Sequence, residues 1–224
     1  MAVRSRYAED RLAAAVAQGV RQYVVLGVGL DTFAYRNPYL GIGLRVFEVD
    51  HPATQAWKRE LLGAAGIAIP PELAFAPVDC ERQTLRDGLQ SVGFNVGEAA
   101  FFSWLGVTPY LTRAAFLATL DFVLSMPALS GVVFDYAVAR SSLNSLEQLA
   151  LDALSRRVAA AGEPFRLFFD PLDLAHELEG KGFQSVEDLA PGEINSRYFS
   201  GRTDGLRVGG GFAHLLSARV GPRA

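Results

Sequence analysis

The segment VVLGVGLDTFAYR, residues 24–36, places two glycines and an aspartate directly after an apolar run. An apolar run followed by a glycine turn predicts a buried strand at the ligand-binding edge of an open α/β sheet. Gly27 and Gly29 would allow a tight turn and close approach of a ligand to the backbone. A dinucleotide-binding turn has a third glycine three residues after Gly29, but that position is Thr32.

Asp31 narrows the range of ligands that this turn could accept. A pyrophosphate beside it would meet a like charge, which costs on the order of 4 kcal/mol at about 4 Å and an effective dielectric near 20. The same carboxylate favours a ligand that carries an ammonium or sulfonium group. The turn therefore argues against a nicotinamide cofactor and for a cationic nucleoside.

Two more acidic residues end the next two apolar segments. In VFEVD, alternation puts Glu48 and Asp50 on one face, with Asp50 at the carboxyl end. The interval from Gly29 to Asp50 is typical of an acid that accepts hydrogen bonds from ribose hydroxyls. Asp79, in PVDCE, could meet an adenine amino group. Two plainer roles stay open: Asp50 as a solvated or helix-capping acid, and Asp79 as a loop acid.

The elements that must hold these residues alternate along the chain. Short apolar runs and stretches of helical period predict five strand–helix units in a doubly wound, mostly parallel α/β sheet. The expected strands are QYVVLG, LRVFEVD, LAFAPVD, AAFFSWLG and SGVVFDYA. Helices are expected through YAEDRLAAAVAQG, after His51-Pro52, through TLRDGLQSVG, after Thr112 as N-cap, and through SLEQLALDALSRRVAAAG. The glycines of GLRVGGGFAHLLSARV suggest a C-terminal antiparallel hairpin.

Composition argues against several classes of protein. A chain of 224 residues suits one domain, and a net charge of −3 with scattered basic residues argues against nucleic acid as a partner. No apolar run reaches the roughly 18 residues that span a membrane, and MAVRSRYAED lacks a signal-peptide core. The lone Cys80 suits a reducing compartment, so we expect a cytoplasmic protein. The three histidines lack the spacing of zinc ligands, so no metal site is expected.

Five segments together resemble one known family. GLDTFAYR, FEVDHPATQ, PVD, FFSWLGVTPYLT and GRTDGLRVGGGFAHL are similar to the leucine carboxyl methyltransferase-like family, above all to its bacterial O-methyltransferases, some linked to polyketide biosynthesis. The resemblance runs from about Arg4 to the C-terminus. It implies a Rossmann-like class I methyltransferase fold, S-adenosyl-L-methionine as cofactor, S-adenosyl-L-homocysteine as product, and a small-molecule methyl acceptor. No membrane partner is implied.

The resemblance implies a role for each matching residue of the cofactor site. Gly27 and Gly29 would approach the methionine part of the cofactor, and Asp50 would bind the ribose. Asp79, with the backbone of Cys80, would meet the adenine.

Other matching positions surround the reactive end. Arg4 falls where the family has an arginine that reaches the methionine carboxylate, with Arg6 as the alternative. Tyr110 corresponds to a tyrosine that lies beside the transferred methyl group. The resemblance implies that Tyr110 contacts the substrate and takes part in catalysis. Leu105 stands where the carboxyl methyltransferases have a glutamate that helps to hold the cofactor. Relatives also have some tens of residues before RSRY, so we expect residues 1–224 to be a single domain without these N-terminal cap helices.

The methyl acceptor is less well defined. Arg197 and Tyr198 could anchor an anionic acceptor near the C-terminal edge. The sequence offers no strong general base, because we expect His51 to start a helix and His214 to face a neighbouring strand. The lack of a base favours an acceptor that needs none, such as a carboxylate or an acidic hydroxyl. Two alternatives stay open: a non-catalytic or partner-dependent relative, and an NAD-dependent oxidoreductase. An apolar edge near the short N-terminus is compatible with a homodimer.

Overall fold

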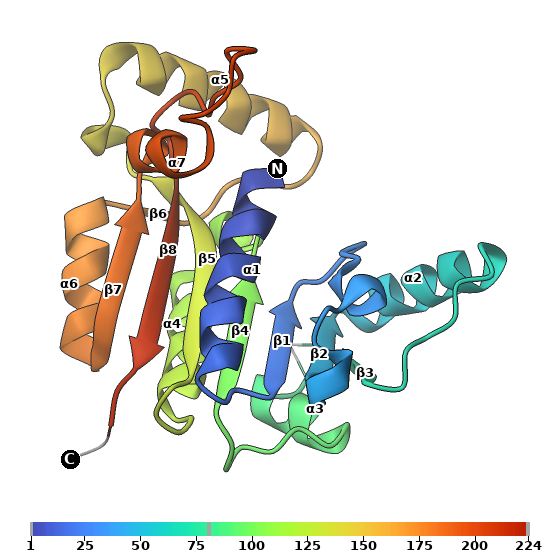
Figure 1. Cartoon of the computed structure of the whole chain (residues 1–224). Coiled ribbons are helices and arrows are strands. Elements are labelled where there is room, and N and C mark those ends of the chain that lie inside the picture. Colours follow the sequence, from blue (N-terminus) through green and yellow to red (C-terminus); the bar gives the residue numbers. More distant parts are fainter. Residues whose placement is uncertain (1, 80–81, 223–224) are drawn as a thin grey trace.

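The computed structural model of the chain describes residues 2–79 and 82–222. Within these residues the strands form one mixed sheet in the order β3-β2-β1-β4-β5-β8-β7, with β6 beside β5 (Figure 1). The strands are β1 (Gln22–Leu26), β2 (Arg45–Asp50), β3 (Leu73–Pro77), β4 (Ala100–Trp104), β5 (Gly131–Val138), β6 (Phe168–Phe169), β7 (Phe183–Leu189) and β8 (Ala213–Val220). Strands β1 to β6 pair in parallel, and β8 pairs antiparallel with both β5 and β7. The predicted doubly wound, mostly parallel sheet is confirmed.

Helices cover both faces of this sheet. They are α1 (Ala2–Ala17), α2 (Pro52–Ala64), α3 (Leu85–Ser91), α4 (Arg113–Leu124), α5 (Ser145–Ala160), α6 (Pro171–Lys181) and α7 (Pro191–Tyr198). Helix α1 crosses one face, α4 lies on the other, and α5 and α7 lie beyond the carboxyl ends of the central strands (Figure 1).

The helix starts follow local capping chemistry. Thr112, predicted as an N-cap, accepts a hydrogen bond from the backbone N–H of Ala115, so this prediction is confirmed. His51 caps α2 by accepting from the N–H of Ala53 through Nδ1, and Pro52 occupies the first helical position. These caps set where each helix leaves the sheet edge.

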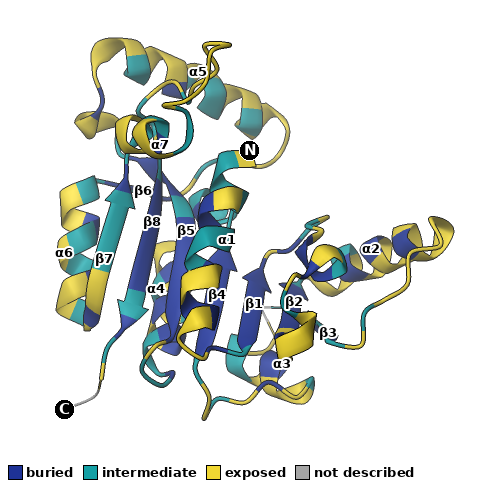
Figure 2. Ribbon diagram, viewed as in Figure 1, coloured by how far each residue is buried: buried dark blue, intermediate teal, exposed yellow. Residues whose placement is uncertain are grey.

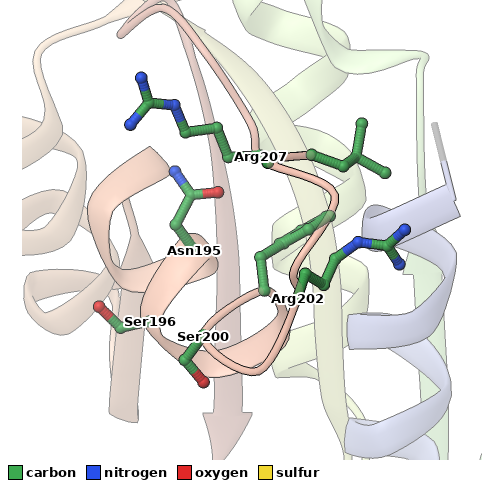
Figure 3. A pocket seen from close by; sticks show the side chains of 8 residues that line it. Asn195, Ser196, Ser200, Arg202 and Arg207 are labelled. Carbon is green, nitrogen blue, oxygen red and sulfur yellow. The ribbon is translucent and has the colours of Figure 1, made fainter.

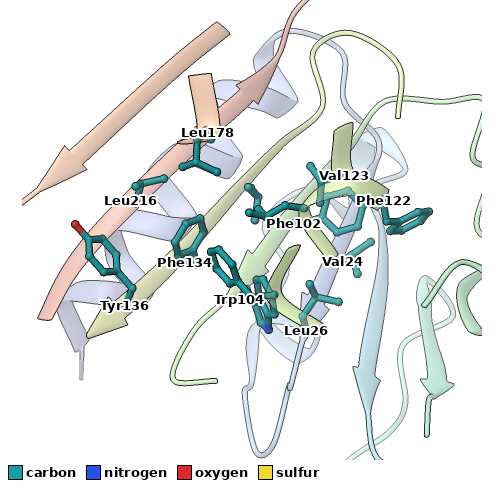
Figure 4. Close-up of a cluster of buried hydrophobic side chains, with 14 of the residues drawn as sticks. Val24, Leu26, Phe102, Trp104, Phe122, Val123, Phe134, Tyr136, Leu178 and Leu216 are labelled. Atoms are coloured by element: carbon teal, nitrogen blue, oxygen red, sulfur yellow. The ribbon is translucent and has the colours of Figure 1, made fainter. Parts of the chain in front are cut away.

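Two apolar layers hold the helices against the sheet, and alternation along each strand separates them. Phe102, Trp104 and Phe134 project into the layer beneath α4 and α6, where Trp104 and Phe134 lie edge to face (Figure 4). Tyr23 and Phe101 belong to the opposite layer beneath α1. The central strands are buried and the edge strand β7 is only partly buried, whereas the outer faces of α2 and α5 are exposed (Figure 2). Since both faces are covered, the strands read as nearly continuous apolar runs.

The antiparallel edge lies where it was expected, but its first strand was placed wrongly. The expected hairpin was confined to residues 205–220, yet only Ala213–Val220 forms a strand there, and its partner is Phe183–Leu189. The connection between them contains α7. Strand β7 lies at the edge of the sheet, and its sequence FQSVEDL is largely polar. It therefore lacks the apolar run by which the central strands were predicted. Helix α1 also begins earlier than expected, at Ala2 rather than near Tyr7.

Candidate cofactor site

A carboxylate closes the glycine turn that follows β1. Gly27 and Gly29 have φ angles of 63° and 50°, in the left-handed region that favours glycine. Asp50, at the end of β2, accepts a hydrogen bond from the N–H of Gly29 at 2.7 Å through Oδ2, and another from the N–H of His51 at 2.7 Å through Oδ1. Each oxygen keeps a further lone pair, and the residue is partly exposed. Asp50 can therefore hold the turn and still accept hydrogen bonds from a diol.

A buried ion pair supports the same turn from below. Lys58 of α2 lies 2.7 Å from Glu48 of β2 and donates to the carbonyl of Asp31 at 2.8 Å. Both charged side chains are almost fully buried, and burial raises the pKa of Glu48 against the opposing effect of Lys58. The Asp31 carboxylate accepts from the N–H of Phe33 at 2.7 Å and stays partly exposed. Glu48 shares a strand face with Asp50, as alternation predicts, but it supports the turn rather than facing a ligand.

A cavity of about 980 Å³ joins three of the predicted cofactor residues, whereas Arg4, Gly29, Asp31 and Leu105 do not line it. Gly27, Asp50 and Asp79 line it at the ends of β1, β2 and β3. Its other lining residues are mainly apolar side chains of the sheet and of α3 and α4, including Leu26, Val49, Val78, Leu85, Trp104, Val107, Leu111 and Phe122. An apolar cleft with a few convergent acids suits a nucleoside whose base is buried and whose sugar is hydrogen-bonded.

The predicted adenine contacts are described only in part. Asp79 is partly exposed and forms an ion pair with Arg82 at 3.2 Å. Cys80 lies outside the described residues. Asp79 thus borders the cavity at the end of β3, next to the segment that would complete the adenine contact.

The loop after β4 brings Arg4 to the sheet edge. Arg4 of α1 forms an ion pair with Asp135 of β5 at 3.1 Å. The N–H of Gly106 donates to the same carboxylate at 2.5 Å. Leu105 is partly buried against the apolar layer beneath α1. The sequence analysis did not predict a role for Asp135. The feature that could have indicated one is that Asp135 is the single acidic residue inside the apolar strand GVVFDYAV.

The predicted acceptor residues do not line this cavity. Tyr110 follows β4 and packs its ring against Phe165, with ring centres 5.4 Å apart. Arg6, the alternative to Arg4 at the methionine carboxylate and also a candidate substrate residue, pairs with Asp10 at 2.8 Å on the exposed face of α1.

Arg197 and Tyr198 are engaged elsewhere. Arg197 binds Glu187 of β7 at 2.8 Å, and Tyr198 donates to Asp10 at 3.0 Å. Both lie on α7, beside a separate hollow of about 540 Å³ (Figure 3). That hollow is lined by Asn195, Ser196, Phe199, Ser200, Arg202, Gly205, Leu206 and Arg207. An anchoring role for Arg197 would require it to leave Glu187.

A histidine–aspartate pair spans the antiparallel edge. His214 of β8 lies 2.8 Å from Oδ2 of Asp188 through Nδ1. Tyr136, opposite His214 on β5, donates to the same oxygen at 3.1 Å, and burial together with Asp188 raises the pKa of Tyr136. His214 was expected to face a strand neighbour, but its link to Asp188 could not be anticipated because the position of β7 was missed.

Gly27 also sets the shape of the cavity. A side chain at Gly27 would overlap the side chain of Val107, whereas one at Gly29 would meet open space. Both backbones are left-handed, which costs an alanine about 1–2 kcal/mol. We expect Gly27→Ala to destabilise the fold more than Gly29→Ala does. Urea unfolding of both variants measures this difference in stability. Val107→Ala combined with Gly27→Ala removes the overlapping side chain and should abolish the difference. Equal losses of stability at the two glycines would show that Val107 does not constrain residue 27.

No helix in the described part of the chain is long and apolar enough to cross a membrane. Residues 2–79 and 82–222 contain no cluster of three histidine, cysteine or acidic side chains able to hold a metal ion.

Comparison with solved structures shows the class of fold. An O-methyltransferase family protein from Burkholderia thailandensis matches with a TM-score of 0.61 and 13% identity, over 98% of this chain and 57% of that one. Magnesium protoporphyrin IX methyltransferase from Synechocystis, solved with bound S-adenosyl-L-homocysteine, matches with a TM-score of 0.56 and 13% identity, over 98% of this chain and 84% of that one. The fold is that of the class I S-adenosyl-L-methionine-dependent methyltransferases.

Sequence comparison defines the family within this class. The family model described as leucine carboxyl methyltransferase matches residues 1–124. The "Putative S-adenosyl-L-methionine-dependent methyltransferase YktD" of Bacillus subtilis is 39% identical over 209 residues, 91% of this chain and 67% of that protein. The chain spans about half the length of related proteins from Mycobacterium and Mycolicibacterium, 46% and 52%. This chain belongs to the leucine carboxyl methyltransferase family, whose cofactor is S-adenosyl-L-methionine.

Proposed function

We propose that this protein is an O-methyltransferase that transfers the methyl group of S-adenosyl-L-methionine to a carboxylate or hydroxyl of a small molecule, such as a polyketide-like metabolite. The observation that carries the cofactor part is the single cavity that contacts Gly27, Asp50 and Asp79 at three adjacent strand ends. The family relationship supports the transfer chemistry.

Methyl transfer from a sulfonium is a direct displacement: the acceptor oxygen forms a bond to the methyl carbon as the carbon–sulfur bond breaks. Positive charge on sulfur is lost in this step, so the protein must mainly align nucleophile, methyl and sulfur. Alignment of this kind can supply about 7–11 kcal/mol at best. The turn held by Asp50 and by the Lys58–Glu48 pair provides a rigid platform for that alignment.

The two acceptor classes differ in their need for a base. A carboxylate attacks without losing a proton, whereas an alcohol or phenol benefits from a proton acceptor. The His214–Asp188 pair holds an imidazole of the kind that serves as a general base, but neither residue lines the cofactor cavity, so a hydroxyl acceptor is the second candidate.

A two-stage experiment tests the proposal. Calorimetry should show that S-adenosyl-L-homocysteine binds more tightly than NAD; the reverse order would overturn the assignment. S-adenosyl-L-methionine labelled in its methyl group is then incubated with panels of small carboxylic acids and phenols. Methyl esters release labelled methanol in alkali and methyl ethers do not, so the product identifies the acceptor. Cofactor binding without label transfer to either panel would favour a non-catalytic or partner-dependent protein.

A further inference from the structure

The cavity at the strand ends continues along helix α4. Ala115, Ala118 and Phe122 all line it, and from Ala115 to Phe122 the helix advances by about 10 Å. Phe122 packs edge to face on Phe102 in the middle of β4, with ring centres 5.9 Å apart (Figure 4). The cavity therefore has a part that runs from the strand ends down the α4 face of the sheet. This part, here named the α4 arm, is lined by Leu85, Arg86, Ala118, Thr119, Phe122 and Ser125.

The far end of the α4 arm is built from an arginine and an aromatic ring. The guanidinium of Arg86, at the start of α3, lies over the ring of Phe122, 5.2 Å from its centre. Arg86 also donates to Oγ of Ser125 at 2.7 Å, and Ser125 is the residue at which α4 ends. These two contacts hold the guanidinium in place, so the arm has a defined end.

The walls of the arm suit an uncharged, apolar group. Leu85 and Phe122 supply apolar surface, and Ala118 is small and exposed, so the space beside it is open to a ligand. The nearby charges already have partners, since Asp121 pairs with Lys181 at 2.6 Å and Arg86 lies on Phe122. A charged group would lose its hydration here without gaining an unpaired opposite charge.

A nucleoside at the strand ends would leave this arm unfilled. Gly27, Asp50 and Asp79 follow the ends of the adjacent strands β1, β2 and β3, so a nucleoside that reaches all three lies across the sheet edge. The arm begins beyond Asp79, because Gln83 and Thr84 line the cavity between that residue and α3. The whole cavity, about 980 Å³, is also at the upper end of the range of about 300–1,000 Å³ that is usual for small-molecule sites.

We propose that the α4 arm is a subsite for an apolar substituent on the amino group of adenine, so that this protein binds adenosine derivatives substituted at that nitrogen. This inference rests on the proposed function, because it requires the adenosine to lie at Asp50 and Asp79. An amino group with one substituent keeps one N–H, so it can still donate to an acceptor at Asp79. An aromatic substituent would then enter the arm beside Ala118 and bury apolar surface against Leu85 and Phe122.

Two forms of one ligand provide the test. The first is S-adenosyl-L-homocysteine, and the second is the same compound with a benzyl group on its adenine amino nitrogen. By calorimetry, we expect the benzyl analogue to bind the unmodified protein at least as tightly as S-adenosyl-L-homocysteine. In Ala118→Phe the new ring fills the arm, so the dissociation constant of the benzyl analogue should rise at least tenfold and that of S-adenosyl-L-homocysteine should change less than twofold.

Ala114→Phe is the matched control. Ala114 also lies on α4 and is exposed, but it does not line the cavity, so the same substitution there should leave both constants unchanged. Weaker binding of the benzyl analogue than of S-adenosyl-L-homocysteine to the unmodified protein would overturn the inference. So would an Ala118→Phe variant that affects both ligands equally or affects neither. If neither ligand binds the unmodified protein, the proposed function fails; if only S-adenosyl-L-homocysteine binds, the proposed function stands and the assignment of the arm fails.

Discussion

Replacement of Asp50 by alanine should weaken binding of S-adenosyl-L-homocysteine by about 1–3 kcal/mol, because the ligand loses charge-assisted hydrogen bonds to its two ribose hydroxyls. We expect the upper end of this range, since Asp50 also holds the N–H groups of Gly29 and His51 at 2.7 Å each. The variant therefore loses both a ligand contact and the support of the turn. Titration calorimetry measures the change.

One further ligand and one further variant make this test specific. 5′-Methylthioadenosine, which keeps the adenosine and the sulfur but lacks the amino-acid end, should lose as much affinity as S-adenosyl-L-homocysteine. Asp50→Asn keeps one acceptor oxygen and should have an intermediate effect. An unchanged dissociation constant in Asp50→Ala would remove Asp50 from the cofactor site.

The largest effect on stability is expected at Lys58. Lys58→Met should lower the free energy of unfolding by about 3–5 kcal/mol, because it leaves the Glu48 carboxylate buried without a partner. The carbonyl of Asp31 also loses its donor, so the turn beneath the cofactor should loosen. Urea unfolding at neutral pH measures the change against a total stability typically of about 5–15 kcal/mol.

The pH dependence of this variant has a definite sign. Burial already raises the pKa of Glu48, and loss of Lys58 removes the groups that oppose this rise. A carboxyl whose folded pKa lies above its unfolded value contributes stability at pH below the unfolded pKa, and this contribution is lost as the pH rises through the folded pKa. The deficit of Lys58→Met should therefore shrink as the pH is lowered from neutrality toward the acidic range.

A double variant separates charge from packing at this position. Glu48→Gln combined with Lys58→Met removes both charges and should be more stable than Lys58→Met alone at neutral pH. If the double variant is no better, or if the deficit is the same at neutral and acidic pH, the unpaired carboxylate is not the cause of the instability.

Much of the fold was predictable because its signals are local. Continuous apolar runs such as QYVVL, the Thr112 cap and Pro52 after His51 are each read within a few residues, and the structure confirms the strands and helices they predict. Asp50 and Asp79 could be placed at one sheet edge because the carboxyl ends of parallel strands coincide. The edge strand β7 escaped detection because solvent exposure allows FQSVEDL a polar composition.

The sequence alone predicted the class of fold, the family, Asp50 at the end of β2 and Asp79 just after β3. Only the tertiary structure decided which distant side chains meet. Arg4 and Asp135 are 131 residues apart, and Asp188 joins His214 only because β7 pairs with β8. Lys58 stabilises the turn because α2 folds back over β2. Periodicity and capping are local because they involve residues a few positions apart. The distant pairs depend instead on the order of the strands in the sheet, and on which face each helix buries against the two apolar layers.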